Sequence, residues 1–366
     1  MSTKSCANDN PIVCTCFEID QVAVKAAIAQ GHDDFRKLRA VLGVAGDCGN
    51  CHRPINKLLK ASRPAKKSTK EALLRRRFPM PWQHMSLAKL AQEYSPSSCV
   101  DDIMVYINDY TKHSKEAQHK LSYRSDLAYS DNVGELLDYF PAQSEGPLMV
   151  YIHGGYWQKL GKDDSCLMAP GLLEQGINVA VIDYTLAPQA SINQMISQCC
   201  RAVAWLVTQA GELGFDAKKV VIAGSSAGGH LCASVLQAAQ QNLHGLSAKS
   251  ISGAVLLSGV YDLRPLVNTY INDPLNLTID SAKDLSPGLY SNQGFAPCII
   301  AYGSNETQEF KRQSQEYHQQ LLSDGVSSVC FEVAERNHFD IVFDLAIEGS
   351  SINQQMNLLI AELANN

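Results

Sequence analysis

The segment VVIAGSSAGGHL, at residues 220–231, combines an apolar strand pattern with a glycine-rich turn and the beginning of a helix. Within it, Gly224, Ser226 and Gly228 form a G-x-S-x-G sequence, which holds a serine on a sharp turn between strand and helix. The helix start adds a positive dipole and free N–H groups. We therefore predict Ser226 as a nucleophile and exclude Ser225, which occupies the first variable position. The alternative is a glycine-rich helix start whose serine has no chemical role.

Further apolar runs, rich in β-branched residues, occur on both sides of this segment and alternate with helical patterns. The runs lie at residues 148–155, 178–184, 253–259 and 297–304, and the helical patterns include Ile192–Ala210 and Phe310–Ser323. Apolar strands that alternate with helices indicate a mostly parallel sheet covered on both faces. Active sites in such sheets lie at the carboxyl ends of the strands, which is where the motifs considered below occur.

A serine hydroxyl needs a base that takes its proton. In a strand–turn–helix arrangement of this kind, the order along the chain is serine, acid and histidine. Two histidines occur late in the chain: His318 within the helical pattern QSQEYHQQL, and His338 between a strand pattern and a helix. Because a loop position allows an imidazole to reach Ser226, we predict His338 as the base and expect His318 to be solvated.

The acid should follow the strand pattern PCIIAYGS, where two glutamates are available, Glu306 and Glu309. Glu306 is nearer to the end of the strand, so we predict that it orients the His338 imidazole and stabilises its protonated form. Glu309 and Asp340 remain alternatives. A surface glutamate without a chemical role is the simplest competing interpretation of Glu306.

The segment YIHGGYWQK, residues 151–159, places two glycines directly after another apolar strand. A tetrahedral intermediate of acyl transfer carries a negative oxygen, which backbone N–H groups must meet at about 2.7–3.1 Å. One such group follows the nucleophile in the sequence, here Ala227, and the other comes from a loop after an earlier strand. Because Gly154 and Gly155 leave the backbone open, we predict Gly155 as the main donor and Tyr156 as a second one.

Together these segments are similar to kynurenine formamidase (arylformamidase), a branch of the α/β-hydrolase fold. The resemblance covers residues 81–366 and is carried by YIHGGYWQ, GSSAGGHL, SGVYDLRPLVNTYINDPLNLT, EFKRQS, NHFDIV and the upstream EYSPSS. It implies hydrolysis of N-formyl-L-kynurenine to L-kynurenine and formate, in tryptophan breakdown, with Ser226 as nucleophile and His338 as base. The family usually has aspartate at the position of Glu306, so the longer glutamate is a departure from its pattern.

A formyl group has no side chain, so recognition must come from the aromatic amine part of such a substrate. Tyr156 and Trp157 are candidate walls of that pocket, and packing against a lid is an equal alternative for Trp157. We expect His153 to shape the loop through hydrogen bonds rather than to act as a second base. Two other functions stay open: a carboxylesterase of small acyl esters, and a redox or iron-responsive binding protein with a vestigial hydrolase domain.

The first part of the chain carries two close cysteine pairs, Cys14 with Cys16 and Cys48 with Cys51. Four thiolates in two pairs suit a [2Fe–2S] cluster or a zinc ion. The pairs and the helical patterns between them resemble the small bacterioferritin-associated-ferredoxin-like (BFD-like) [2Fe–2S] domain, which favours iron–sulfur over zinc. Formamide hydrolysis needs no electrons, so such a cluster would have a regulatory, structural or docking role, with a redox protein as a candidate partner, or the fusion would serve another pathway step.

A stretch rich in lysine and arginine, residues 57–77, separates this part from the α/β part. We therefore predict a small all-α iron–sulfur domain at residues 1–60, a basic linker at residues 61–80 and an α/β-hydrolase domain at residues 81–366. A docking surface for an acidic partner is the alternative function of the basic stretch.

Charge and composition limit the setting in which the chain works. Its formal net charge of -6 argues against general nucleic-acid binding. The start of the chain lacks a signal-peptide pattern, and no apolar run approaches the roughly 20 residues that span a bilayer. We expect a cytoplasmic protein that acts on a small molecule, with its twelve cysteines kept reduced.

Overall fold

The computed structural model describes residues 12–14, 19–30, 32, 34–44, 51–62, 81–143 and 145–363. The chain forms two compact units, Met1–Met80 and Pro81–Asn366, and each is described by itself. Of the basic linker predicted at residues 61–80, the described part is Ala61 and Ser62.

The small unit combines helices with a short antiparallel ribbon. Its described elements are β1 (Ile12–Cys14), β2 (Ile19–Asp20), α1 (Gln21–Ala29), α2 (Phe35–Leu42) and α3 (His52–Ser62). The side chains of Asp20 and Asp34 accept hydrogen bonds from N–H groups in the first turns of α1 and α2, which begins these helices. Gly43 ends α2 in the left-handed conformation that glycine adopts readily. The ribbon is an addition to the all-α arrangement that the sequence predicts.

The large unit is built on an eight-stranded sheet. In chain order its strands are β3 (Arg124–Ala128), β4 (Leu136–Phe140), β5 (Leu148–Ile152), β6 (Asn178–Ile182), β7 (Val220–Ser225), β8 (Gly253–Leu257), β9 (Cys298–Asn305) and β10 (Ser328–Asn337). Their order across the sheet is β10-β9-β8-β7-β5-β6-β4-β3. The neighbours from β10 to β6 pair in parallel, whereas β4 is antiparallel to both β6 and β3. The prediction of a mostly parallel sheet is confirmed.

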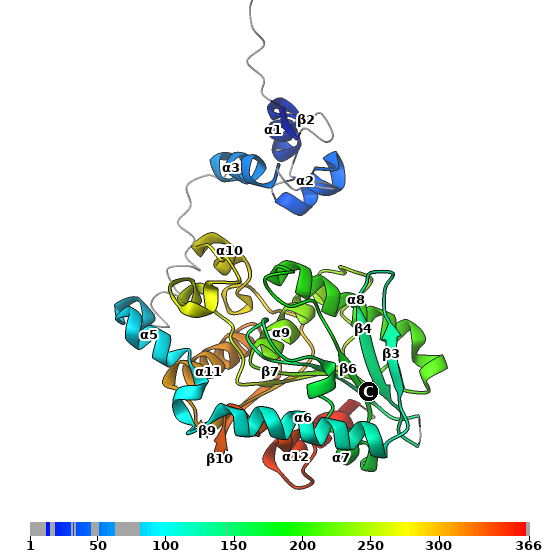
Figure 1. Cartoon of the computed structure of the whole chain (residues 1–366). Coiled ribbons are helices and arrows are strands. Elements are labelled where there is room, and N and C mark those ends of the chain that lie inside the picture. Colours follow the sequence, from blue (N-terminus) through cyan, green and yellow to red (C-terminus); the bar gives the residue numbers. More distant parts are fainter. Residues whose placement is uncertain are drawn as a thin grey trace, which may run out of the picture. The chain divides into compact units, whose positions relative to one another are not determined.

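Helices cover both faces of this sheet (Figure 1). The α-helices are α5 (Leu87–Glu93), α6 (Ile103–Lys120), α7 (Ala169–Glu174), α8 (Ile192–Leu213), α9 (Ala227–Gln240), α10 (Ile279–Asp284), α11 (Gln308–Ser323) and α12 (Ser351–Leu363). Short 3₁₀ helices lie between them: η1 (Pro81–His84), η2 (Pro96–Cys99), η3 (Lys162–Asp164), η4 (Arg264–Asn268), η5 (Tyr270–Asn272), η6 (Pro287–Leu289) and η7 (Asp340–Leu345). Within the described residues, none of the helices has the length and apolarity needed to cross a membrane.

The side chains of β5 alternate between the two faces of the sheet, as a strand requires. Leu148, Val150 and Ile152 pack in a core with residues of α8, α9 and α11. Met149 and Tyr151 pack in a second core with residues of α6, α7 and α12. Because both faces are covered, the sequence of this strand is continuously apolar.

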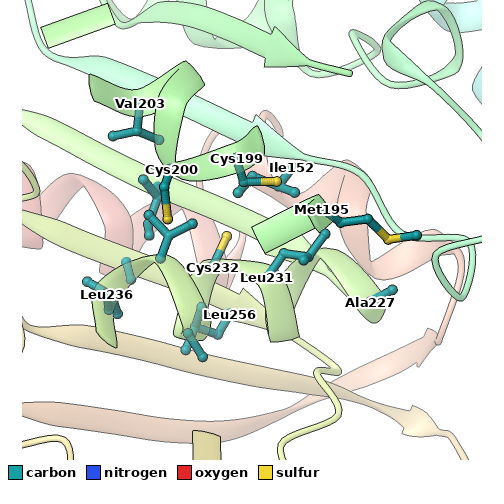
Figure 2. Close-up of a cluster of buried hydrophobic side chains, with 14 of the residues drawn as sticks. Ile152, Met195, Cys199, Cys200, Val203, Ala227, Leu231, Cys232, Leu236 and Leu256 are labelled. Carbon is teal, nitrogen blue, oxygen red and sulfur yellow. The ribbon is translucent and has the colours of Figure 1, made fainter. Parts of the chain in front are cut away.

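Helix α9, which follows the G-x-S-x-G turn, is held between α8 and the sheet (Figure 2). Figure 2 shows Leu231 and Cys232 of α9 among buried side chains of α8 and the strands. The helix approaches the sheet closely: a Cβ atom on Gly224 would lie 2.9 Å from the sulfur of Cys232. A Cβ atom on Gly228 would collide with the carbonyl oxygen of Ile152. Packing therefore requires both glycines of the motif.

Candidate active site

Ser226 lies on a strained turn between the last residue of β7 and the first residue of α9. Its φ of 57° and ψ of -118° fall outside the regions that residues other than glycine usually occupy. The residue is buried, and its backbone N–H donates to the carbonyl oxygen of Leu257 at the end of β8. Such strain at a serine between strand and helix is typical of a nucleophile. Ser225, by contrast, is the last residue of β7 itself.

The predicted base and acid are in direct contact. The Nδ1 atom of His338, just after β10, lies 2.9 Å from Oε2 of Glu306, and both residues are buried. This contact engages Nδ1 and leaves Nε2 for proton transfer. The other late histidine, His318, lies on α11 with its Nδ1 atom 2.9 Å from the hydroxyl of Ser328. It is half-buried rather than fully solvated, and burial lowers its pKa.

The two alternative acids have other partners. Glu309 is buried, and the guanidinium of Arg312 donates to both of its carboxylate oxygens at 2.8 and 2.6 Å. Asp340 accepts hydrogen bonds from the backbone N–H and the side-chain amide of Asn337. Of the three carboxylates considered from the sequence, the structure brings Glu306 to the histidine ring.

The strand order explains why three distant segments meet. Strands β7, β8, β9 and β10 are parallel neighbours, so their carboxyl ends lie along one edge of the sheet. Hydrogen bonds connect the segments that leave these ends: the N–H of Ser226 donates to Leu257, and the hydroxyl of Ser258 donates to Glu306 at 2.6 Å. The serine, the acid and His338 therefore lie on the same edge.

The loop after β5, residues 153–159 (the glycine loop), has an unusual backbone. Gly155, Tyr156 and Trp157 have φ values of 93°, 52° and 61°, all on the left-handed side. A Cβ atom on Gly155 would collide with the carbonyl oxygen four residues later, so this position needs glycine for both conformation and space. A Cβ atom on Gly154 would lie 3.4 Å from the Cβ atom of Ser226. The glycine loop therefore lies directly beside the serine.

Hydrogen bonds from the loop after β6 hold the carbonyl groups of the glycine loop. The hydroxyl of Tyr184 lies 3.0 Å from the carbonyl oxygen of His153 and 3.3 Å from that of Gly154. The N–H of Ala187 donates to the carbonyl oxygen of Trp157 at 2.8 Å. These bonds fix the peptide planes of the loop, and with them the directions of its N–H groups.

Several N–H groups beside the serine lack a protein acceptor. Among the hydrogen bonds of the described residues, none has the backbone N–H of Gly155 or Tyr156 as its donor. Ala227 is the first residue of α9, so its N–H has no acceptor within the helix. The dipole of α9 adds positive potential at the same point. Groups of this kind can hold the negative oxygen of a tetrahedral intermediate.

The two aromatic residues of the glycine loop have different surroundings. The Tyr156 side chain is half-buried, and its hydroxyl donates to the carbonyl oxygen of Tyr94 at 2.6 Å. Trp157 is fully buried, and its ring meets that of His230 edge to face with centroids 5.1 Å apart. The sequence could not separate these two surroundings, because both residues sit next to each other in the same loop.

His153, the first residue of the glycine loop, is buried and packs within the loop. Its ring stacks on Tyr184 with centroids 4.2 Å apart, and its Nδ1 atom lies 2.9 Å from the carbonyl oxygen of Gly154. Burial lowers the pKa of His153 to about 4. The imidazole is therefore neutral at pH 7, with Nδ1 donating to that carbonyl oxygen.

The segment before the sheet contributes contacts that sequence reasoning missed. Tyr94, which follows α5, is fully buried, and its hydroxyl donates to Oε2 of Glu309 at 2.8 Å. Its carbonyl oxygen accepts the hydroxyl of Tyr156, and the hydroxyl of Thr307 donates to the carbonyl oxygen of Glu93. This segment therefore connects the glycine loop with the turn that carries the acid. No local pattern could reveal contacts between residues so distant in the chain.

In the small unit the structure describes two of the four predicted cysteine ligands. Cys14 ends β1 and Cys51 directly precedes α3, and both are buried in the same small core. Cys16 and Cys48 lie outside the described residues. Two buried sulfurs, one of them beside a helix start, fit the donor set of a [2Fe–2S] cluster or a zinc ion. Within the described ranges no group of three metal-binding side chains occurs.

Known proteins resemble both units. The BD-FAE family model matches residues 137–321, and the model of the BFD-like [2Fe-2S] binding domain matches residues 12–61. Kynurenine formamidase of Danio rerio is 35% identical over 281 residues, which cover 73% of this chain and 94% of the relative. Kynurenine formamidase of Salmo salar is 31% identical over 281 residues, which cover 72% and 93%.

Solved structures share the architecture of the large unit. Esterase B of Lactobacillus rhamnosis superposes with a TM-score of 0.59 at 18% identity, covering 74% of this chain and 96% of the esterase. That likeness concerns the α/β-hydrolase fold alone, whereas the identity to the two fish enzymes extends over nearly their whole length. The chain is therefore a hydrolase that belongs to the kynurenine formamidase family, with a BFD-like [2Fe–2S] binding domain in its first part.

Proposed function

We propose that the chain hydrolyses N-formyl-L-kynurenine to L-kynurenine and formate, in tryptophan breakdown, with Ser226, His338 and Glu306 as its catalytic residues. The observation that carries the proposal is the 2.9 Å contact between His338 and Glu306 on the sheet edge that holds Ser226. Unpaired backbone N–H groups lie beside the same serine. These are the parts that acyl transfer requires: a nucleophile, a base, an orienting acid and donors for the oxyanion.

In the first half of the reaction, Oγ of Ser226 attacks the formyl carbon while Nε2 of His338 accepts the hydroxyl proton. The former carbonyl oxygen becomes negative and is held by the N–H groups of Gly155 and Ala227, with that of Tyr156 as an additional donor. His338 then gives the proton to the aryl nitrogen as the C–N bond breaks. L-Kynurenine leaves, and the formyl group remains on the serine.

In the second half, water attacks the formyl ester while Nε2 of His338 accepts a proton from the water. The proton returns to Oγ of Ser226 as the ester C–O bond breaks, and formate leaves. Glu306 holds the imidazole through Nδ1 in both halves and stabilises the imidazolium whenever it forms.

The glycine loop also bears on substrate recognition. Because a formyl group has no side chain, the aromatic amine part of the substrate is the part that a pocket can select. Tyr156 is half-buried, so we assign it to the wall that faces this amine. Trp157 is fully buried against His230, so we assign it to packing beneath the loop rather than to that wall.

We further propose that residues 1–60 form a [2Fe–2S] module joined by the basic linker at 61–80 to the hydrolase at 81–366. The module's ligands would be Cys14, Cys16, Cys48 and Cys51, with a zinc ion as the alternative occupant. The family match over residues 12–61 and the burial of the two described sulfurs support this proposal. Such a cluster supplies one-electron transfer when bound. Because formamide hydrolysis moves no electrons, we assign the module a regulatory, structural or docking role, with a redox protein as a candidate partner.

We place the chain in the cytosol. All seven cysteines of the large unit are free thiols in the structure, five of them fully or nearly fully buried among apolar side chains. Cysteines that stay reduced are the expectation for a reducing compartment.

The test of the proposed function compares kcat/KM for N-formyl-L-kynurenine with kcat/KM for p-nitrophenyl acetate, using the purified full chain. We expect the formamide to be preferred. In Ser226→Ala, turnover should fall by several orders of magnitude, whereas the matched control Ser225→Ala should keep it. A strong preference for the acetate would favour a carboxylesterase. A chain that holds its cluster but hydrolyses neither compound would favour the redox or iron-responsive binding protein.

A further inference from the structure

The carboxylate of Glu306 is held by more than its contact with the histidine. Its Oε2 atom faces the ring of His338, while its Oε1 atom accepts hydrogen bonds from the hydroxyl of Ser258 and from the backbone N–H of Gly303, each 2.6 Å long. A carboxylate has about four lone-pair sites and accepts three such bonds without crowding. The two oxygens therefore have separate tasks: Oε1 is fixed to the sheet, and Oε2 meets the imidazole.

Ser258 occupies its position in a strained conformation. Its φ is 48°, in a region that is uncommon for residues other than glycine. The residue is fully buried directly after β8, and its N–H donates to the carbonyl oxygen of Ala301 in β9 at 2.8 Å. Strain of this kind persists where surrounding contacts over-determine it, and it is concentrated at active sites. A glycine would relieve the strain, but it would have no hydroxyl for Glu306.

The second donor, Gly303, lies within strand β9. A Cβ atom on Gly303 would collide with the carbonyl oxygen of Arg336 and lie 3.1 Å from the carbonyl carbon of Asn337. Strand β9 thus touches the backbone of the residues that directly precede His338. Both groups that hold Oε1 of Glu306 are therefore anchored where β8, β9 and β10 lie side by side.

We propose that Ser258 is a positioning residue for the hydrolysis: its hydroxyl, together with the N–H of Gly303, keeps Oε2 of Glu306 on the ring of His338. This inference rests on the proposed function, because it takes Glu306 as the acid. The length of the side chain is part of the arrangement. The carboxylate folds back onto an N–H group three residues earlier and still reaches the imidazole. An aspartate on the same backbone is shorter by one C–C bond of about 1.5 Å, so we expect it to lose one of the two contacts.

Two substitutions separate the hydroxyl from the backbone strain. Ser258→Ala removes the hydroxyl and keeps the strain, whereas Ser258→Gly removes both. Ser314→Ala is the matched control, because Ser314 is also a fully buried serine, and its hydroxyl has no partner among the described residues. Steady-state kinetics with N-formyl-L-kynurenine report on catalysis. The low-field proton resonance of the His338 Nδ1–H reports on the contact with Glu306. Loss of that resonance in His338→Gln assigns it.

Both Ser258 variants should lower kcat by about tenfold or more, because loss of a hydrogen bond to a charged group has an effect of this size. KM should stay unchanged, and the low-field resonance should shift or broaden in both. The control should keep kcat and the resonance. Wild-type kcat and an unshifted resonance in either Ser258 variant would overturn the inference, as would full recovery of activity in Ser258→Gly, which would assign the effect of alanine to strain.

Glu306→Asp keeps the inference testable if both Ser258 variants fail to fold. The predicted result is a kcat about tenfold or more below wild type, and wild-type kcat would contradict the argument from side-chain length. Ser226→Ala, measured in the same experiment, distinguishes failure of the proposed function from failure of the positioning role of Ser258. Wild-type turnover in Ser226→Ala would refute the proposed function, while the low-field resonance would still test Ser258. Loss of turnover in Ser226→Ala together with full activity in Ser258→Ala would refute the positioning role alone.

Discussion

Replacement of Gly155 by alanine should remove most of the activity and leave the chain folded. An alanine with this φ of 93° is disfavoured by about 1–2 kcal/mol or more. Its Cβ atom would also collide with the carbonyl oxygen of Lys159, so the glycine loop must move. The N–H of residue 155 moves with the loop, away from the position proposed for the oxyanion. Loss of one such donor costs about 10²–10³ in kcat, which is the fall that we expect with N-formyl-L-kynurenine.

Gly349→Ala is the matched control for this prediction. Gly349 has a φ of 83°, but no atom lies within 4 Å of a Cβ atom built on it, so the substitution carries the conformational cost without the collision. Steady-state kinetics and thermal unfolding of both variants give the result. The control should lose about 1–2 kcal/mol of stability and keep its kcat. Wild-type kcat in Gly155→Ala would refute the role of the glycine loop, and so would an equal fall in kcat in both variants.

Three further predictions concern stability and the small unit. Burial lowers the pKa of His230 to about 4 from its ordinary 6.5, so as pH falls the unfolded chain binds the proton first. Protonation of His230 in the unfolded chain should therefore cost about 2 kcal/mol of stability between pH 7 and pH 5, and His153, whose pKa burial also lowers, adds a loss of its own. The Nε2 atom of His230 lies 2.8 Å from the carbonyl oxygen of Leu285, and the side-chain amide of a glutamine can still donate to that oxygen. His230→Gln should therefore remove the His230 part of the loss in urea unfolding, and an unchanged pH dependence would contradict the assignment. Tyr94→Phe should lower the free energy of unfolding by about 1–3 kcal/mol, since its hydroxyl joins two buried side chains of α11; unchanged stability would count against it. Cys14→Ser with Cys51→Ser should abolish visible absorbance and bound iron while kcat is kept, and absorbance that survives both changes would rule these ligands out.

The fold of the large unit could be predicted because the sequence patterns that indicate its strands and helices are local. Each of the apolar runs at the centre of the sheet is short and bounded by turn residues, and the helical patterns between them have the usual period. The helix predicted at Ile192–Ala210 extends over Ile192–Leu213 in the structure. The antiparallel strands β3 and β4 were not predicted. Strand β3 is mostly exposed and carries no apolar pattern.

The candidate site was open to prediction only in part. The spacing of Ser226 and the glycines identifies them as site candidates in the sequence. His338 and Glu306 are candidates because of their positions after strands. The supporting contacts have no such signal. Tyr94 and Glu309 are 215 positions apart in the chain, and Ser258 looks like an ordinary residue after a strand. Their roles depend on which strands become neighbours, and a single sequence does not contain that information.

Acceptance of the formyl group by Ser226 can be measured directly. The full chain is mixed with N-formyl-L-kynurenine, quenched in acid during the first turnover and digested, and its peptides are weighed by mass spectrometry. We expect one added formyl group on the peptide that contains Ser226, and none on the same peptide of Ser226→Ala. A formyl group on any other peptide, or normal release of formate by Ser226→Ala, would contradict this role of Ser226.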